Sequence, residues 1–209
     1  MHYKLCLFNF VFLAGLTFGE TSNYLTPSKY SLQLRTNGLQ DVSSLLPGTT
    51  ISIKKMITSL EGIRISAGIS AGSSSSENSS QGYGTGESKQ NSLSFALYVT
   101  KLKYAYRNKN LYLYYGYGPF GKYSFQYSAD SYQQTTTNIF SGGLSGYLGV
   151  EWFFYEHFSL FTEYSLNATM QYSRWSSKIN GSNLVSSPTI TKNFNVNSNS
   201  ALIGFSIYL

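Results

Sequence analysis

The stretch GYLGVEWFFYEHFSLFTEYSL, residues 146–166, decides the fold of this chain. On each side of a short EHF turn, apolar residues alternate with polar or small ones, which is the period of a β-strand with two different faces. The apolar faces carry Leu148, Val150, Trp152 and Phe154 before the turn, and Phe158, Leu160, Tyr164 and Leu166 after it. Glu151 and Glu163 lie on the opposite, polar faces. The stretch therefore predicts an antiparallel hairpin that is oily on one side only.

The same alternation recurs along the chain and predicts eight strands. They are expected near residues 28–37, 49–58, 62–72, 91–106, 110–128, 139–155, 158–174 and 193–209. Short turns, SLEG, NKN and EHF, follow the second, fourth and sixth strands. Long links rich in Ser, Asn, Gly and Thr follow the odd-numbered strands. An even strand count with short turns at one end and long loops at the other is typical of a transmembrane β-barrel.

A soluble lipocalin-like barrel has the same alternation with the polarity reversed, apolar inside and polar outside. Strand length and composition favour lipid. Several predicted strands approach 16 residues, whereas strands in soluble sheets usually have about 5 to 6. Charged residues make up 11% of the chain, against about 25% in ordinary soluble domains. Aromatic residues also gather where interfacial girdles would lie, at Tyr104, Tyr106, Tyr112, Trp152 and Phe158 near the short turns and Tyr127, Phe140, Tyr172 and Trp175 near the long links.

The N-terminus has the layout of a secretory signal peptide. Lys4 precedes an apolar run over residues 5–16, and small residues precede Glu20, so cleavage is expected after Gly19. The predicted mature domain is then residues 20–209. Cys6 is the only cysteine of the chain, so the mature domain has neither a disulfide nor a thiolate metal site.

These features resemble the small outer-membrane β-barrel family of Gram-negative bacteria, of the OmpA and OmpX type. The resemblance rests on the signal-like start, on YLYYGYGPFG (residues 112–121), on the hairpin quoted above and on the terminal ALIGFSIYL. It implies an all-β, eight-stranded antiparallel up-and-down transmembrane barrel, exported to the outer membrane and inserted there by the barrel assembly machinery. The family typically ends in Phe or Trp, whereas this chain ends in Leu. The predicted assembly strand carries its apolar face on Ala201, Ile203, Phe205, Ile207 and Leu209.

Sites for catalysis, cofactors and metals are not predicted. GYGPFG, residues 116–121, matches the dinucleotide fingerprint, but that fingerprint needs a following helix and another strand pattern follows here. His157 is the only histidine after the signal segment and lies in a turn, without the partners that nucleophilic catalysis or a metal would need. The formal charge is +6, but the basic residues are dispersed and export argues against nucleic acid as a partner.

Charged residues on the polar strand faces predict a cluster inside the barrel. In a hairpin, the residue numbers of cross-strand partners have a constant sum that is set by the turn. A sum of about 314 for the EHF turn places Glu151 beside Glu163, and the same reflection about the SLEG turn pairs Lys54 with Arg64. Lys103 lies at a similar height above the short turns. An eight-stranded lumen is just wide enough for side chains to fill, and charges there must compensate one another. We expect Arg64 to bind both glutamates with its planar fork.

The sequence thus predicts a monomeric outer-membrane barrel that contacts lipid, with a structural or surface-interaction role through four long extracellular loops. It predicts no enzymatic activity and no cofactor. A ligand of the loops is left unidentified. Two alternatives stay open at this point: a narrow porin-like channel for small solutes, and a secreted soluble ligand-binding barrel.

Overall fold

The computed structural model describes residues 24–36, 49–80, 83–108, 110–130, 132–179, 187–198 and 201–209, and this part of the chain is all-β. Its strands are β1 (Tyr30–Thr36), β2 (Thr49–Met56), β3 (Glu61–Ser80), β4 (Tyr83–Asn108), β5 (Leu111–Ala129), β6 (Gln133–Tyr155), β7 (Phe158–Ile179), β8 (Thr189–Ser198) and β9 (Leu202–Tyr208). The predicted signal segment, residues 1–19, lies outside the described residues.

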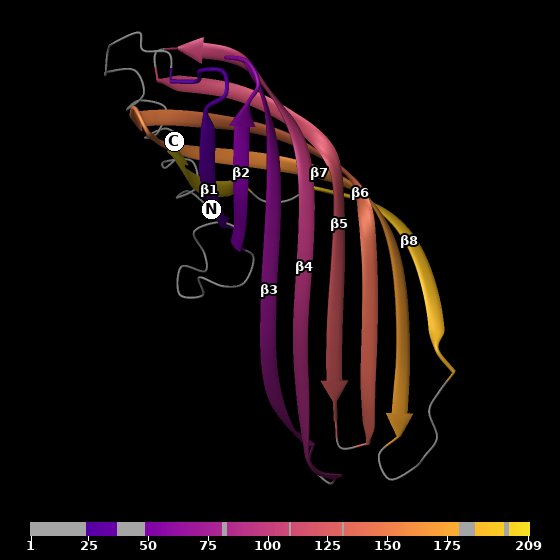
Figure 1. The fold of residues 1–209 in the computed structure, drawn as a ribbon. Coiled ribbons are helices and arrows are strands. Elements are labelled where there is room, and N and C mark those ends of the chain that lie inside the picture. The colour runs from indigo at the N-terminus through magenta and orange to yellow at the C-terminus, as the bar shows by residue number, and fades with distance from the viewer. Residues whose placement is uncertain are drawn as a thin grey trace.

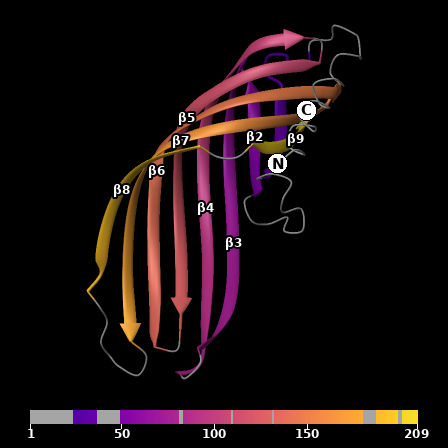
Figure 2. The same cartoon turned by 180° about the vertical axis from the view of Figure 1, so that it is seen from behind.

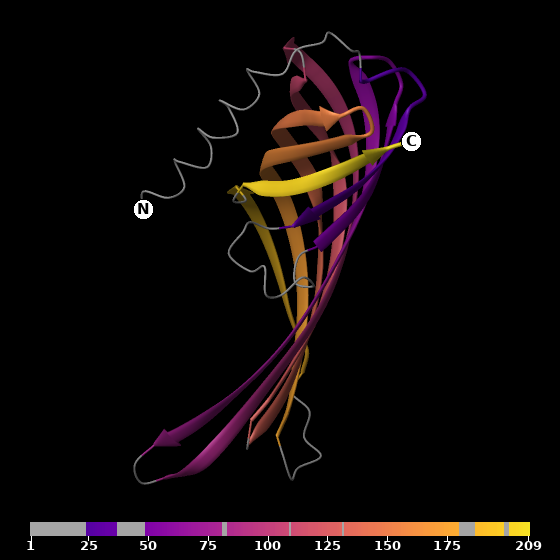
Figure 3. The ribbon, with the colours of Figure 1, turned by 90° about the vertical axis from the view of Figure 1, so that its left-hand side faces the viewer.

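The strands close into an antiparallel ring of eight positions. Each strand from β1 to β7 pairs with the next, and β9 closes the ring by pairing with both β1 and β7. β9 pairs with residues 158–163 of β7, and β8 pairs with residues 166–175 further along the same strand. β8 and β9 therefore occupy one position in the ring, which is the single strand predicted at 193–209. Figure 3 shows the ring from the side, with β9 in yellow. The prediction of an eight-stranded antiparallel barrel is confirmed.

The two faces of the barrel wall have opposite polarity. On β2, Ser52 and Lys54 are buried in the lumen, whereas Ile51 and Ile53 point outward and are 55% and 58% exposed. On β1, Ser31 and Gln33 are buried in the same way. The lumen is thus polar, and the outside is apolar. Large apolar side chains exposed in a continuous belt need an apolar solvent. This polarity is the reverse of that of a soluble ligand-binding barrel.

The predicted long links contain much strand, which corrects the expectation of four long loops. β3 continues to Ser80 and β4 begins at Tyr83, so the link over residues 73–90 is a hairpin extension. The link over 128–138 is mostly strand, β7 and β8 extend into the two ends of the link over 176–192, and the link over 37–48 lies outside the described residues. Ser, Thr and Asn are common in loops, but antiparallel pairing is made by backbone groups that every residue except proline carries in full. Composition alone therefore misplaced the strand ends.

These extensions form a curved sheet beyond the ring. Figures 1 and 2 show β3 to β8 continuing well past β1 and β2. We call this part the extended sheet; it comprises residues 72–80, 83–92, 122–129, 133–141, 171–179 and 189–196. The molecule therefore has two parts, a closed ring at the short-turn end and an open sheet at the other.

An apolar cluster fills the short-turn end of the lumen. Leu25, Met56 and Phe153 are fully buried there, and the ring of Tyr24 stacks on Phe153 with centroids 5.0 Å apart. Tyr24 and Leu25 precede β1, so the chain entering the barrel contributes to the cluster. Ser28, with a φ of 66°, turns the chain from there into β1. This end of the barrel is closed by packed side chains.

Candidate functional site in the barrel lumen

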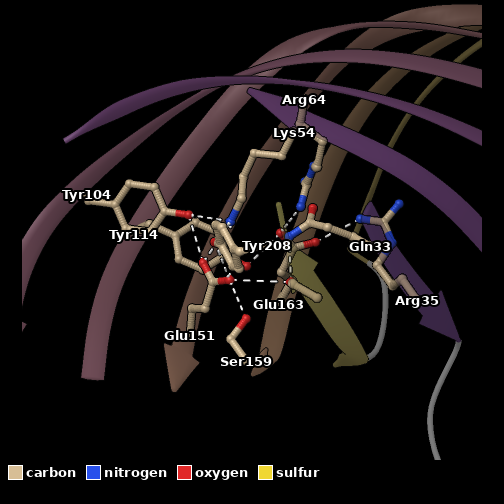
Figure 4. Close-up of polar contacts among 11 residues, drawn as sticks. Gln33, Arg35, Lys54, Arg64, Tyr104, Tyr114, Glu151, Ser159, Glu163 and Tyr208 are labelled. Carbon is tan, nitrogen blue, oxygen red and sulfur yellow. Dashed lines mark hydrogen bonds and ion pairs between the residues drawn. The ribbon is translucent and has the colours of Figure 1, made fainter. Parts of the chain in front are cut away.

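Next to the apolar cluster lies a network of buried charges, drawn in Figure 4. Strand alternation points Lys54 on β2, Arg64 on β3, Glu151 on β6 and Glu163 on β7 into the lumen, and each is 1% exposed. The structure pairs Lys54 with Arg64 across β2 and β3, as the SLEG reflection predicts. Four of the five residues of the predicted cluster are thus brought together.

Glu151 forms the centre of the first half of the network. Its Oε2 accepts from Lys54 Nζ at 2.9 Å and from the Tyr104 hydroxyl at 2.8 Å. Its Oε1 accepts from Ser159 at 2.6 Å and from the Tyr208 hydroxyl at 2.7 Å. Both carboxylate oxygens are therefore multiply hydrogen-bonded, which is what a buried charge needs to be tolerated.

Glu163 forms the centre of the second half and holds two arginines. Its Oε2 accepts from Arg35 Nη1 at 2.7 Å, and its Oε1 accepts from Arg64 Nη1 and from the Tyr114 hydroxyl, the latter at 2.8 Å. The Tyr147 ring lies against both guanidinium groups, with centroid distances of 5.7 Å to Arg35 and 5.0 Å to Arg64. Cation–π contact adds to the ion pairs because the site is desolvated.

The role expected of Arg64 is wrong. Arg64 pairs with Glu163, while Glu151 pairs with Lys54, so no single guanidinium among the described residues binds both carboxylates. The reason is the β6–β7 register, in which paired positions sum to 312 rather than about 314: Glu151 faces Phe161, and Glu163 faces Gly149. The two glutamates are therefore offset along the barrel, and one carboxylate bridges two arginines instead.

Lys103 does not belong to the network. On β4 the lumen-facing residues are Thr100, Leu102 and Tyr104, so Lys103 has the opposite parity and points outward. It lies 3.3 Å from Glu61 in an exposed ion pair, with Lys101 also close to that carboxylate at 3.4 Å. The height of a residue above the turns does not determine which face it lies on, since its face follows from its parity along the strand.

Several residues of the lumen were not predicted from the sequence. Arg35 shares a strand face with Ser31 and Gln33, and this polar face of β1 is a signal that could have found it. Their height predicts Tyr104 and Tyr112 in an interfacial girdle, and this prediction is wrong, because they are 4% and 0% exposed inside the lumen. Alternation along the strand places both tyrosines on the same face as their buried neighbours, and this alternation, not their height along the barrel, decides that they face the lumen. The side chain of Tyr106 lies outside the described residues.

Gly149 makes room for another tyrosine. A Cβ at this position would lie 2.6 Å from the Tyr114 ring and 2.9 Å from the Thr162 carbonyl oxygen. Because Gly149 is the cross-strand partner of Glu163, its missing side chain lets Tyr114 cross β6 and reach that carboxylate. Glycine at position 149 therefore supports the network because it lets the Tyr114 side chain pass close to the β6 backbone.

The network has buried donors that no described residue satisfies, namely Nε and Nη2 of Arg64 and the Ser66 hydroxyl. Such groups in a polar lumen are normally met by water or a ligand.

No group of three or more His, Cys, Asp or Glu residues among the described positions could hold a metal ion. His157 Nδ1 lies 3.0 Å from the Tyr208 carbonyl oxygen, at the turn after β6.

The strand predicted to direct assembly corresponds to β9 and its flanking residues, and β9 has the expected alternation. Ile203, Phe205 and Ile207 alternate with the buried Leu202, Ser206 and Tyr208, and β9 packs Phe205 against Phe154 and Phe158 on the outer face. Ala201 and Leu209 flank β9 and are exposed, Leu209 at 80%. The backbone N–H of Leu209 donates to the Tyr30 carbonyl at 2.9 Å, which joins the chain end to β1.

Among the described residues, no helix has the length and apolar character to cross a bilayer.

No protein-family model and no curated protein matches the chain. Among solved structures, it is similar to a major outer membrane protein from Thermus thermophilus, with a TM-score of 0.55 and 10% identity over 87% of this chain and 99% of that one. It also matches Acinetobacter baumannii CarO, with a TM-score of 0.39 and 12% identity over 90% of this chain and 100% of that one. The attachment invasion locus protein Ail of Yersinia pestis gives a TM-score of 0.34 and 10% identity over 87% and 94% of the two chains.

At 10% identity the likeness to the Thermus protein shows the fold alone, and that fold agrees with the closed ring, the polar lumen and the apolar outer face. The chain has the fold of bacterial outer-membrane β-barrel proteins.

Proposed function

We propose that this chain is an integral outer-membrane barrel that does not conduct solutes and that acts through the extended sheet at the cell surface. The observation that carries the proposal is the filled lumen: the apolar cluster around Leu25 and Phe153 is followed directly by the ion-pair network of Glu151 and Glu163. An eight-stranded barrel has no room for a channel beside such side chains. We expect the protein to be a monomer, inserted by the assembly machinery and without enzymatic activity.

The closed lumen predicts the absence of ion conductance. Protein inserted into a planar bilayer should give no discrete current steps, because ions would have to displace packed aromatic rings and break buried ion pairs. Insertion should be verified in parallel by protection of the barrel strands from added protease. Steady single-channel currents whose size changes in Glu151→Gln would instead support the porin-like alternative.

The extended sheet supports the surface role. Its described side chains on β8 are all exposed, and Ser73 to Ser76 on β3 are exposed as well. A sheet that leaves the ring on the side opposite the short turns lies outside the cell if the turns face the periplasm, as in known barrels. On β8, one face of the sheet carries the hydroxyl and amide groups of Thr189, Thr191, Asn193 and Asn195, and the other face carries exposed apolar side chains that include Ile190, Phe194 and Val196.

Cysteine labelling tests this orientation. In a Cys6→Ser background, Ser74→Cys should react with a membrane-impermeant maleimide on intact cells, because it lies in the extended sheet. Glu156→Cys, exposed in the turn between β6 and β7, should react only after the outer membrane is permeabilised. Both variants change an exposed residue, so each controls for the other. Labelling of Glu156→Cys alone on intact cells would reverse the orientation and refute the surface role of the sheet.

A further inference from the structure

The lumen contains a polar cavity of about 400 Å³ on the side of the network that faces the extended sheet. We call it the vestibule. Every described strand contributes to its lining, including Arg35 on β1, Tyr98 on β4, Lys122 on β5, Tyr147 on β6 and Asn167 on β7. Its volume lies within the range of pockets that bind small molecules.

The vestibule is electropositive. Arg35 and Lys122 line it, and none of the described lining residues is acidic. The network below it holds three cations, Arg35, Lys54 and Arg64, and two carboxylates, Glu151 and Glu163, so it carries a net charge of +1 (3 − 2). A positive cavity inside a low-dielectric wall concentrates anions. An uncompensated charge inside a barrel also requires a counter-charge or solvent.

Hydrogen-bond donors face the vestibule as well. Arg35 uses Nη1 for Glu163, and in Figure 4 the other end of its guanidinium group points away from the network. Asn167 accepts from Ser145 at its Oδ1, at 2.6 Å, so its amide nitrogen has two N–H groups to offer a ligand. A guanidinium fork, an amide and an ammonium group on the wall of one cavity form a donor set suited to oxyanions.

We infer that the vestibule binds a small solute through a carboxylate or phosphate group, held between Arg35 and Lys122. The polar remainder of the solute lies against the hydroxyl groups of Tyr98 and Tyr147. Because the network and the apolar cluster close the lumen below it, the vestibule is a binding site with one entrance. This assignment goes beyond the surface role proposed above and does not depend on it.

Isothermal titration of the detergent-solubilised protein tests the site, with inorganic phosphate, acetate and glucose as probes in a zwitterionic buffer. We expect saturable binding of one phosphate or one acetate per barrel, and none of glucose. Comparison of phosphate with acetate tells which oxyanion the site prefers. Absence of saturable binding for both anions would overturn the inference.

Variants separate the vestibule from general surface charge. Lys122→Gln should weaken anion binding at least tenfold, and Lys122→Arg should retain it. Lys192→Gln removes the same charge from an exposed position on β8 that does not line the vestibule, and should change binding less than twofold. Equal unfolding midpoints of these variants would show that the barrel is intact. Equal weakening in Lys122→Gln and Lys192→Gln would mean that only diffuse charge attracts the anion, and would also overturn the inference.

Discussion

Deleting residues 206–209 should abolish assembly of the barrel. These residues make the last pairings on both sides of β9: Ser206 pairs with Gln33 on β1 and with Ser159 on β7, and Tyr208 pairs with Ser31. Without them, the backbone groups of β1 and β7 lose their partners next to lipid, where each unsatisfied group costs several kcal/mol. The deletion also removes the Tyr208 hydroxyl from Glu151 and Lys54.

Phe205→Asp tests the same strand without shortening it. Phe205 stacks on Phe158 with ring centroids 5.7 Å apart on the outer face. An aspartate at this position would place a carboxylate among lipid chains, so Phe205→Asp should prevent assembly. Phe205→Leu keeps an apolar side chain and is the matched control, which should assemble. Assembly is measured by the gel shift between unheated and boiled samples and by protease resistance in vesicles. A truncated chain that remains membrane-integrated and protease-resistant would contradict the role of β9 in closing the ring.

The closed ring could be predicted because alternation is a local property of the sequence. In β2 and β3, Ile53 and Ile65 face one side and Lys54 and Arg64 the other, and the SLEG turn fixes the register between them. One face is apolar and the other polar, so a shift by one residue would expose the charges to lipid. The sequence therefore determines both the faces and the pairing of this hairpin.

The β6–β7 register could not be predicted, because it depends on an irregularity in the strand. The ladder shifts between Phe153 and Tyr155, so that Tyr155 faces Phe158 while Phe153 faces Ser159. The turn pairs Tyr155 with Phe158, whose positions sum to 313, and the bulge lowers the sum to 312 for the rest of the ladder. The bulge also interrupts the alternation, because Phe154 and Tyr155 are both exposed. A reflection with a sum of about 314 therefore misplaces these pairs by two residues, one from the turn centre and one from the bulge, and predicts Glu151 and Glu163 side by side.

The lumen tyrosines show a different limit of sequence reasoning. A tyrosine suits both a lipid interface and a buried polar network, because it has an apolar ring and a hydroxyl group. Height along the strand cannot separate these roles, but parity can: Tyr104 shares its face with Thr100, and Tyr115 with the outward Leu113. The partners of each hydroxyl depend on side chains from distant strands, which a single sequence does not bring together.

Glu163→Gln should destabilise the barrel more than Arg64→Met. Glu163 is the carboxylate that contacts both Arg35 and Arg64, and Glu151 is occupied by Lys54. Loss of the Glu163 charge leaves two buried guanidinium groups without an anion, and breaking a buried pair in this way costs about 3 to 5 kcal/mol. In Arg64→Met, Arg35 and Glu163 still pair, so the loss should be smaller. The free energy of unfolding in lipid vesicles is measured by urea titration, with the fluorescence of Trp152 and Trp175 as the signal.

The double variant decides whether the charges act as one network. Arg64→Met combined with Glu163→Gln leaves Arg35 as the one cation of this half of the network, and Arg35 lines the vestibule and can reach water there. The double variant should therefore be more stable than Glu163→Gln alone, because the second substitution removes a charge that the first one left unpaired. Lys103→Met is the control, since Lys103 pairs with Glu61 on the exposed outer face and should change stability little. Strictly additive losses from Arg64→Met and Glu163→Gln would mean that the two side chains do not stabilise each other, and the network would then be no more than a set of neighbouring charges.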